Sequence, residues 1–369
     1  MRSMRTAAKI PIAHPFIGDE ERQRVLDVLA SGILVADRVV REFEDAFAAY
    51  IGVPHAVATS SGTAALQVAL EALGIGAGDR VVTTPFTFAA TSHAILHAGA
   101  RPVFADIDAQ TGNLDPAAAE DAVRREGAKA ILVVHLYGLP ADLDALGEVA
   151  ARHGLLLIED CAQAHGATYR GRKVGSFGDA AIFSFYPTKN MTTGEGGMVL
   201  TADAQAARRA RLLVDPRGED EYVYSVIGYN FRMTDVAAAM GLPQLRRLER
   251  SNEARRRNAR ALTAGLNGLS WLTTPIEPAG ATPVYTAYTV RTRAREALMA
   301  HLAREGVGHK IYYPMLIPHT PAYRALGFDG DFPVAERWTR EVLSLPVHPA
   351  LTDEDLRRII EVVTAFSPR

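Results

Sequence analysis

Short apolar runs alternate with longer amphipathic runs over the first two-thirds of the chain. Seven of the apolar runs are rich in Val, Ile, Leu and Phe with little polar alternation, as expected of strands buried on both faces. They cover His55–Ser60, Arg80–Pro85, Pro102–Ile107, Ala130–Leu136, Leu155–Asp160, Ala180–Phe185 and Gly197–Thr201. The helical patterns between them cover Thr63–Leu73, Ala89–Ala98, Pro116–Glu126 and Ala141–His153. This alternation predicts an α/β domain in which helices flank a mostly parallel seven-stranded sheet.

The pattern changes after about Pro243. Leu245–Leu266 predicts one long helix in which arginine recurs, at Arg246, Arg247, Arg250, Arg255, Arg256, Arg257 and Arg260. Beyond it come a strand candidate, a helix, a loop rich in Pro and Tyr, and a last helix, at Tyr285–Arg291, Arg295–Glu305, Tyr312–Tyr323 and Thr352–Phe366. We therefore expect a large α/β domain at 1–244 and a smaller C-terminal α+β domain at 245–369. The N-terminal segment, roughly 30 residues, is expected to pack on the small domain.

Composition narrows the class of protein. A chain of 369 residues is too long for one hydrophobic core, and 48% hydrophobic with 22% charged residues is typical of a globular protein. The net charge of −2 provides no attraction for nucleic acid or an anionic membrane, and no apolar run reaches the roughly 18 residues of a membrane span. The single cysteine, Cys161, cannot form an internal disulfide, which fits a reducing compartment. We expect a cytoplasmic enzyme without a nucleic-acid or membrane partner.

The strand ends carry the candidate chemistry, because ligands of such sheets bind beyond the carboxyl ends of the strands. In Ala58–Leu66 a strand ends in a Ser-Ser-Gly turn and a helix begins at once. Free N–H groups and the positive end of the helix dipole then point to one spot, which suits a phosphate. Gly62 and Thr63 are therefore candidate phosphate ligands. A plain helix cap is the alternative that this turn leaves open.

A buried acid is expected at the end of another strand. Leu155–Asp160 is followed by Gln163 and His165, and a buried Asp160 needs a cationic or hydrogen-bonding partner to stay ionised. The protonated ring nitrogen of pyridoxal phosphate (PLP) is such a partner, and its protonation is what makes PLP an electron sink. An Asp that caps the following helix is the alternative. We expect Cys161 to be a small buried filler.

Lys189 is the candidate nucleophile. The chain has five lysines and 35 arginines, so an ordinary surface position would more often carry Arg. Lys189 follows an apolar strand, and a lysine in a partly desolvated pocket has a lowered pKa and can form a Schiff base. A lysine in a surface loop is the alternative. Phe88, which follows another apolar strand, is placed either to stack on a cofactor ring or to pack in the core. No Cys/His cluster has metal-ligand spacing, so no metal is expected.

Seven motifs stand in order along the chain. They are Thr84–Phe88 (TPFTF), Val134–Asp142 (VHLYGLPAD), Glu159–Gly166 (EDCAQAHG), Gly175–Asp179 (GSFGD), Phe183–Asn190 (FSFYPTKN), Tyr229–Asp235 (YNFRMTD) and Glu341–Pro349 (EVLSLPVHP). Over nearly the whole chain they resemble the DegT/DnrJ/EryC1/StrS sugar aminotransferases, which are PLP-dependent enzymes of fold type I. The resemblance implies that fold and that cofactor.

The resemblance also implies roles at the matching positions. Lys189 would hold the cofactor covalently and then move protons as the catalytic base. Asp160 would pair with the pyridine nitrogen as the second catalytic residue. Phe88 would stack on one face of the ring, and Gln163 would approach the opposite side or the phenolic oxygen.

The implied phosphate ligands are Gly62, Thr63 and Ser184. Asn230 looks like the residue that such enzymes lend to the phosphate of the neighbouring subunit, which implies a homodimer with shared active sites.

The implied substrate contacts are Arg232, Tyr313 and His319. Two stretches on the substrate side depart from the family pattern: Leu213–Gly218 lacks the His-Gly pair of many relatives, and Tyr313–Pro321 lacks their Leu-His pair. The identity of the substrate is therefore left open by the sequence.

The implied reaction is a ping-pong transfer. L-glutamate leaves its amino group and departs as 2-oxoglutarate, and a keto-sugar linked to a nucleoside diphosphate takes the amino group. The spelling of Gly194–Gly197 (GEGG) favours amination at sugar C4. Amination of a cyclitol (keto-inositol) and dehydration on the same scaffold are alternatives, although a dehydrating branch carries histidine in place of Lys189. A non-enzymatic PLP-binding regulator is a third reading. The arginine-rich helix either meets a diphosphate or forms a solvated face with Glu249 and Glu253.

Overall fold

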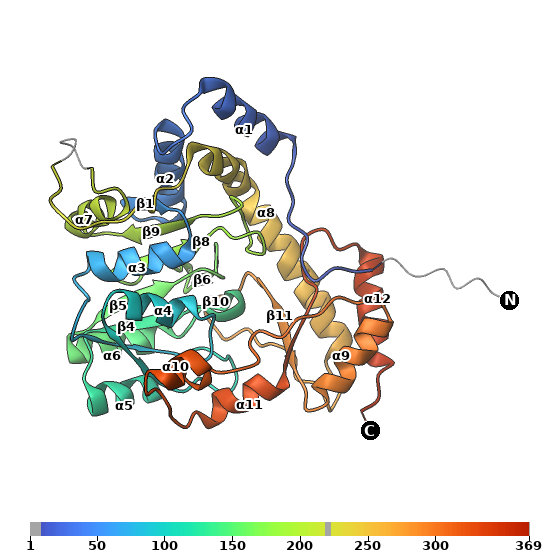
Figure 1. Cartoon of the computed structure of the whole chain (residues 1–369). Coiled ribbons are helices and arrows are strands. Elements are labelled where there is room, and N and C mark those ends of the chain that lie inside the picture. Colours follow the sequence, from blue (N-terminus) through green and yellow to red (C-terminus); the bar gives the residue numbers. More distant parts are fainter. Residues whose placement is uncertain (1–8, 218–222, 369) are drawn as a thin grey trace.

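The computed structural model describes residues 9–217 and 223–368, and within them the seven predicted strands form one sheet (Figure 1). The strands are β1 (His55–Thr59), β2 (Arg80–Thr83), β3 (Arg101–Phe104), β4 (Ala130–Val134), β5 (Leu156–Asp160), β8 (Ala180–Ser184) and β9 (Gly197–Thr201). Their order is β1-β9-β8-β5-β4-β2-β3, and β9 is antiparallel to both of its neighbours. The other six strands therefore run in one direction and end at the same edge. The expected mostly parallel sheet is confirmed.

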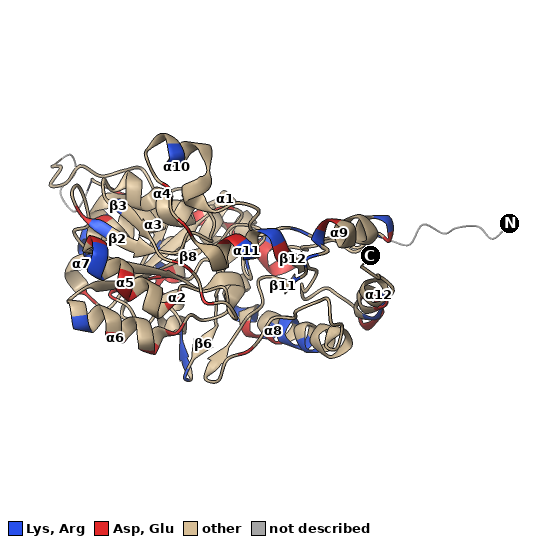
Figure 2. Ribbon diagram, turned by 90° about the horizontal axis from the view of Figure 1, so that it is seen from below, with Lys and Arg blue, Asp and Glu red and all other residues tan. Residues whose placement is uncertain are grey.

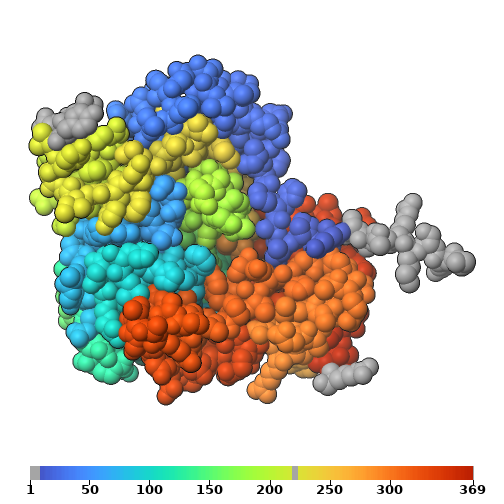
Figure 3. Space-filling model, in the orientation of Figure 1, coloured from blue at the N-terminus to red at the C-terminus, as the bar shows by residue number. Residues whose placement is uncertain are grey.

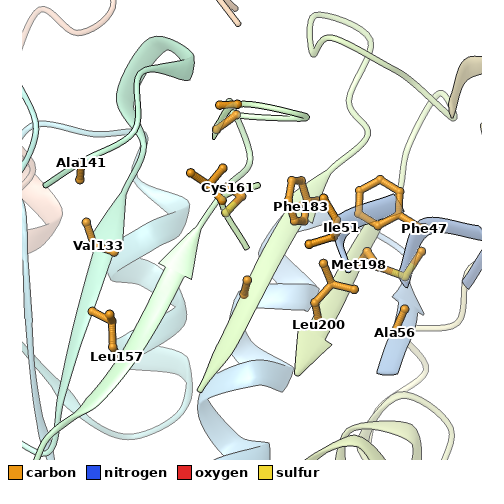
Figure 4. Close-up of a cluster of buried hydrophobic side chains, with 14 of the residues drawn as sticks. Phe47, Ile51, Ala56, Val133, Ala141, Leu157, Cys161, Phe183, Met198 and Leu200 are labelled. Atoms are coloured by element: carbon orange, nitrogen blue, oxygen red, sulfur yellow. The ribbon is translucent and has the colours of Figure 1, made fainter. Parts of the chain in front are cut away.

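Helices cover both faces of this sheet and bury an apolar core on each. On one face lie α3 (Gly62–Ala72), α4 (Ala90–His97) and α7 (Ala204–Val214). On the other lie α2 (Arg38–Ile51), α5 (Pro116–Glu126) and α6 (Leu143–His153). Figure 4 shows part of the second core, in which Phe47, Phe183 and Met198 pack together. Cys161 is fully buried in the same cluster, so its expected role as a small filler is confirmed.

The long arginine-rich helix, α8 (Asp235–Leu266), begins ten residues earlier than the sequence indicated. The Thr234 hydroxyl caps it by accepting a hydrogen bond from the Ala237 N–H at 3.2 Å, and Pro243 lies inside the helix. Pro243 removes one intrahelical hydrogen bond and was therefore read as a boundary. The helix continues because its first half packs against α1 (Asp19–Ser31) and α2, and that burial offsets the missing bond.

The C-terminal part forms a small α+β unit with its own core. β11 (Tyr288–Arg291) and β12 (Val342–Leu345) pair antiparallel, and α9 (Arg295–Arg304), α12 (Asp353–Thr364) and the second half of α8 pack around them. β11 begins three residues later than the strand predicted from the sequence. The segment expected to be a loop contains two short helices, η2 (Ile317–His319) and α10 (Pro321–Ala325), and α11 (Pro333–Glu341) follows.

The N-terminal segment is divided between two surroundings. Ile10 pairs with the small unit, since its N–H donates to the Gly306 carbonyl at 2.9 Å and its carbonyl accepts from the Gly308 N–H at 2.7 Å. The following α1 instead lies along α8 (Figure 1). The remaining elements are η1 (Leu136–Gly138) and a three-stranded sheet of β6 (Thr168–Tyr169), β7 (Arg172–Lys173) and β10 (Ala281–Thr282). Among the described helices, none is long and apolar enough to cross a membrane.

Candidate active site

Four candidate residues from different strands lie at one edge of the sheet. Asp160 ends β5, Ser184 ends β8, Phe88 lies just beyond β2, and Gly62 opens the helix after β1. All four strands run in the same direction, so their ends meet. Lys189 follows β8 by five residues and reaches the same region.

Asp160 is 4% exposed and is held by two hydrogen bonds. One carboxylate oxygen accepts from the Thr91 hydroxyl at 2.9 Å and the other from the Ala162 N–H at 3.1 Å. Burial raises the pKa of Asp160, and these two hydrogen bonds and the charge of Lys189 partly oppose the rise. The carboxylate is therefore fixed in orientation at a place where a further cation would favour its ionised form.

Lys189 lies in the same desolvated region. Burial lowers the pKa of its amine, and the charge of Asp160 partly opposes that shift. A lowered pKa makes the neutral, nucleophilic form of the amine more available near neutral pH. Two adjoining cavities, of about 60 and 310 Å³, share Lys189, Thr188 and Ala13 in their walls. In Figure 3 the yellow-green loop after β8 reaches the surface near the blue N-terminal segment and the orange small unit.

The start of α3 forms the expected cradle for an anion. The Ser61 hydroxyl caps the helix by accepting from the Ala64 N–H at 3.1 Å, which leaves the first N–H groups directed out of the helix end. A Cβ atom at Gly62 would lie only 2.6 Å from the Ser184 Cβ, so β8 approaches the helix start as closely as glycine allows. This contact brings the Ser184 hydroxyl beside the turn that contains Gly62 and Thr63.

Phe88 and Gln163 are linked through Tyr313. The ring of Phe88 is 59% exposed, and its centroid lies 6.4 Å from that of Tyr313. Gln163 is oriented at both ends of its amide: its oxygen accepts from the Tyr137 N–H at 2.8 Å, and its nitrogen donates to the Tyr313 hydroxyl at 3.1 Å. Tyr313 is thus brought into contact with two of the predicted cofactor residues.

A buried amide network behind Lys189 was not predicted. The Asn190 amide donates to the Asn252 oxygen at 2.8 Å, and the Asn252 amide donates to the His165 carbonyl at 2.7 Å. The Thr286 hydroxyl lies within hydrogen-bond distance of both the Asn190 oxygen, at 2.7 Å, and the Gln163 carbonyl. The network ties the loop of Lys189 to the loop after Asp160 and to α8. Its members are isolated polar residues far apart in the chain, so no sequence motif indicates it.

Glu159 supports the site from the other side of β5. Its two oxygens accept from three backbone N–H groups, of Gly175, Phe177 and Gly178, at 2.8–2.9 Å, and lie 3.1 Å from His135 Nε2. His135 Nδ1 accepts from the Ala141 N–H, so Nε2 is the ring nitrogen that donates to Glu159. Burial raises the pKa of Glu159, but the hydrogen bonds from His135 and from the backbone outweigh it, and the net pKa lies below its ordinary value.

The predicted substrate residues are dispersed. Arg232 pairs with Asp215 at 3.3 Å and lines a separate cavity of about 140 Å³. His319 Nε2 lies 2.9 Å from the Gly330 carbonyl, outside the walls of the two cavities at Lys189. Of the three, only Tyr313 lines a cavity with Lys189. Asn230 is exposed, and the stretch expected to differ from relatives, 213–218, ends at a residue outside the described ranges.

Comparison with known proteins places these features in a family. The model of the DegT/DnrJ/EryC1/StrS aminotransferase family matches residues 15–364. The chain is 41% identical to a "pleiotropic regulatory protein" of Geobacillus stearothermophilus, over 94% of each chain. It is also 41% identical to the GDP-perosamine synthase of Caulobacter vibrioides, over 95% of this chain and 96% of that one. The crystal structure of S. venezuelae DesV with a ketimine intermediate superimposes with a TM-score of 0.90 at 40% identity, over 94% of this chain and 93% of that one.

Proposed function

The chain belongs to the DegT/DnrJ/EryC1/StrS family of PLP-dependent sugar aminotransferases, and from this premise we propose that it moves an amino group from L-glutamate to the C4 keto group of a nucleotide-linked deoxysugar. The observation that carries the proposal is the convergence of Lys189, Asp160 and the α3 cradle at one sheet edge. The nucleotide-linked substrate is supported by relatives such as GDP-perosamine synthase. Amination at sugar C4 is supported by the sequence of Gly194–Gly197, GEGG.

The residues present fit PLP. Ser184 approaches Gly62 so closely that no larger residue fits at position 62, and this contact brings the Ser184 hydroxyl beside the free N–H groups at the start of α3, where a phosphate would bind. The buried Asp160 carboxylate lacks a full counter-charge, which a protonated pyridine nitrogen would provide. The exposed ring of Phe88 offers a flat face to a flat group.

Each of these residues would then have a defined task. Bound PLP supplies an electron-withdrawing ring that stabilises the charge left on the substrate carbon when a proton is removed. Lys189, with its lowered pKa, holds the cofactor and afterwards moves the proton between the reacting carbon atoms. Asp160 keeps the pyridine nitrogen protonated, and the α3 N-terminus and Ser184 hold the phosphate. Gln163, oriented at both ends of its amide, would limit the rotation of the ring.

A second copy of the chain is part of the proposal. Exposed apolar side chains run from α1 into the segment before α2: Leu26, Leu29, Ile33, Leu34 and Val35 are 45–59% exposed. Val223, Tyr224 and Ile227, in the segment that leads to Asn230, are exposed as well. An apolar surface of this kind is typical of a subunit interface. A homodimer would cover it and would present Asn230 to the partner's phosphate.

An absorption spectrum tests the first half-reaction. The purified holoenzyme should show the band of lysine-bound PLP near the visible edge, and L-glutamate should bleach it. Lys189→Ala should lack both the band and the bleaching. Lys129→Ala, which removes a surface lysine paired with Asp79 at 2.9 Å, should behave as the wild type and is the matched control. A wild-type protein that takes up no PLP when supplied with it would refute the proposal.

Product analysis tests the second half-reaction. With ¹⁵N-labelled glutamate and nucleotide-linked keto-sugars, NMR should place the label on carbon 4 of the sugar. Label on a keto-inositol, or loss of a hydroxyl group without transfer of label, would instead support the cyclitol or dehydration alternative. A PLP band without turnover on any ketone would support a regulator.

A further inference from the structure

Arg255 is a buried cation that pairs with no carboxylate of residues 9–217 and 223–368. It is 7% exposed, and its Nη1 donates to the Tyr285 carbonyl at 3.1 Å. Its Nε–H is buried and has no hydrogen-bond acceptor among the described residues. Arg255 therefore differs from the usual buried arginine, whose planar group of donors is matched by a carboxylate.

The surroundings of Arg255 do not compensate its charge. Burial lowers the pKa of Arg255 to about 10, so the guanidinium remains protonated at neutral pH. Burial also lowers the pKa of the two neighbouring histidines, His165 and His348, and the pKa of His165 is about 3. Both histidines are therefore neutral at neutral pH. A buried charge in this state is costly unless a ligand completes its pairing.

The other arginines of α8, which all lie between Arg246 and Arg260, have ordinary surroundings; Figure 2 shows basic positions on this helix in blue. Four of them pair with carboxylates within the described part of the chain: Arg246 with Glu20, Arg247 with Glu21, and Arg256 and Arg260 with Glu253. Arg250 and Arg257 are exposed to solvent. The solvated-face reading of this helix thus holds for these residues and fails for Arg255.

Arg255 lines the larger of the two cavities at Lys189. This cavity, of about 310 Å³, is bounded by the loop of Lys189 and Asn190, by α8 through Arg247 and Arg255, and by the N-terminal segment at His14. No Asp or Glu is among the described residues that form its wall. The cavity is therefore a positively charged recess that contains the proposed nucleophile at one side and an unpaired guanidinium at another.

We propose that Arg255 binds a carboxylate of the amino donor, through its Nε–H and the adjacent terminal nitrogen. A dicarboxylate such as glutamate fits the recess better than a nucleoside diphosphate does, because about 310 Å³ is at the lower end of the range for ligand pockets. The donor must also enter the pocket of Lys189 to react, and this cavity shares that residue. The inference rests on the proposed transamination and adds a residue that selects the donor.

Binding of 2-oxoglutarate to the PLP-loaded enzyme tests this assignment, since the keto acid does not react with that form. Arg255→Met should raise the Kd of 2-oxoglutarate, measured by calorimetry, by about 10- to 100-fold, the loss expected for hydrogen bonds to a charged group. Arg255→Lys, which keeps the charge but not the planar pair of donors, should recover part of the affinity. Arg257→Met, two residues along the same helix and exposed, should leave the Kd unchanged within about twofold.

The same variants identify the anion. Binding of UDP, dTDP and GDP should be unaffected by Arg255→Met; a selective loss of nucleotide binding would overturn the carboxylate assignment. In the bleaching assay, L-glutamine distinguishes the two carboxylates of glutamate, because it lacks the side-chain carboxylate. If Arg255→Met slows bleaching by both donors, Arg255 binds the α-carboxylate. If it slows bleaching by glutamate alone, Arg255 binds the side-chain carboxylate. Unchanged 2-oxoglutarate affinity in both variants would refute the proposal. Failure of the wild type to bleach would instead refute the proposed transamination, whatever the binding results.

Discussion

The contact between Gly62 and Ser184 makes a quantitative prediction about cofactor binding. A methyl group at position 62 would lie 2.6 Å from the Ser184 Cβ and 2.9 Å from its Oγ, whereas non-bonded carbon atoms pack at about 3.5–4.0 Å. In Gly62→Ala the start of α3 must therefore move by about 1 Å away from β8. Overpacking of this kind destabilises the folded protein by about 1–3 kcal/mol. Replacing glycine also makes the unfolded chain stiffer, which stabilises the folded protein by at most about 1 kcal/mol and does not offset the clash. We expect PLP affinity to fall by about 5- to 100-fold.

A double-variant cycle separates this steric cause from a general weakening. Ser184→Gly alone removes one phosphate ligand and should weaken PLP binding by about fivefold, as expected for one hydrogen bond. It also removes the two atoms that a Cβ at position 62 would strike, and leaves the Ser184 Cα at 3.3 Å. The double variant should therefore bind PLP about as well as Ser184→Gly alone. Absorbance titration of the apoenzyme measures all four Kd values. Losses that multiply in the double variant would refute the steric argument.

Three further predictions concern the acid, its neighbour and the interface. Asp160→Asn should still bind PLP but should slow bleaching by glutamate by about 100- to 1,000-fold, because a neutral amide no longer stabilises the charged ring. Stopped-flow absorbance at equal saturation measures the bleaching rate. An unchanged rate would contradict the role of Asp160. Glu159→Gln puts an amide against backbone N–H donors and should cost about 3–5 kcal/mol in the free energy of unfolding, measured with urea at pH 7. Because the pKa of Glu159 is lowered in the folded protein, its contribution to the free energy of unfolding is complete above the ordinary value of 4.5 and is lost as the pH falls through the folded value. The difference in the free energy of unfolding between wild type and variant should therefore shrink below pH 4.5. A difference that stays constant with pH would contradict the assignment. Ile33→Glu should shift the protein towards monomer in light scattering and weaken PLP retention, whereas Leu326→Glu, at a comparably exposed position just after α10, should do neither.

The sheet was predictable because its strands are buried on both faces. A strand such as Ala130–Val134 is entirely apolar, and an apolar run of this length is typical of a strand that helices cover on each side. The rule that ligands lie beyond the carboxyl ends of parallel strands then selects Asp160 and the turn at Gly62 from the sequence alone. The small unit was less predictable, because its elements are short and are stabilised by long-range packing. The start of α8 was misplaced because Pro243 is a helix breaker by local chemistry, and only the contacts with α1 and α2 overrule it.

The hydrogen-bond network behind the loop of Lys189 was not predictable from the sequence. Asn190 and Asn252 are 62 residues apart, and Asn190 and Thr286 are 96 apart. Single amides and hydroxyls carry no periodic signal, so only the fold reveals that they meet. Their burial nevertheless has a consequence for function: every polar atom in such a network must be satisfied, so the loop of Lys189 has few alternative positions. The reactive amine is fixed by residues that no strand-end rule would select.

The burial of Arg255 was partly predictable from the sequence. The seven arginines of the helix look alike in the sequence, but the buried positions of its second half follow one stripe, at Leu248, Asn252, Arg255, Asn258, Ala259, Leu262 and Leu266. Their spacing of three and four residues is that of a helix face packed on a core. An apolar stripe followed back from Leu266 therefore reaches Asn258, Arg255 and Asn252, and three polar residues in an otherwise apolar stripe require partners. The Asn258 amide donates to the backbone carbonyls of Val347 and His348. Asn252 finds its partners in the amide network at Lys189. No described residue is a partner for the open side of the Arg255 guanidinium, and the cavity that Arg255 shares with Lys189 is where the donor has to react.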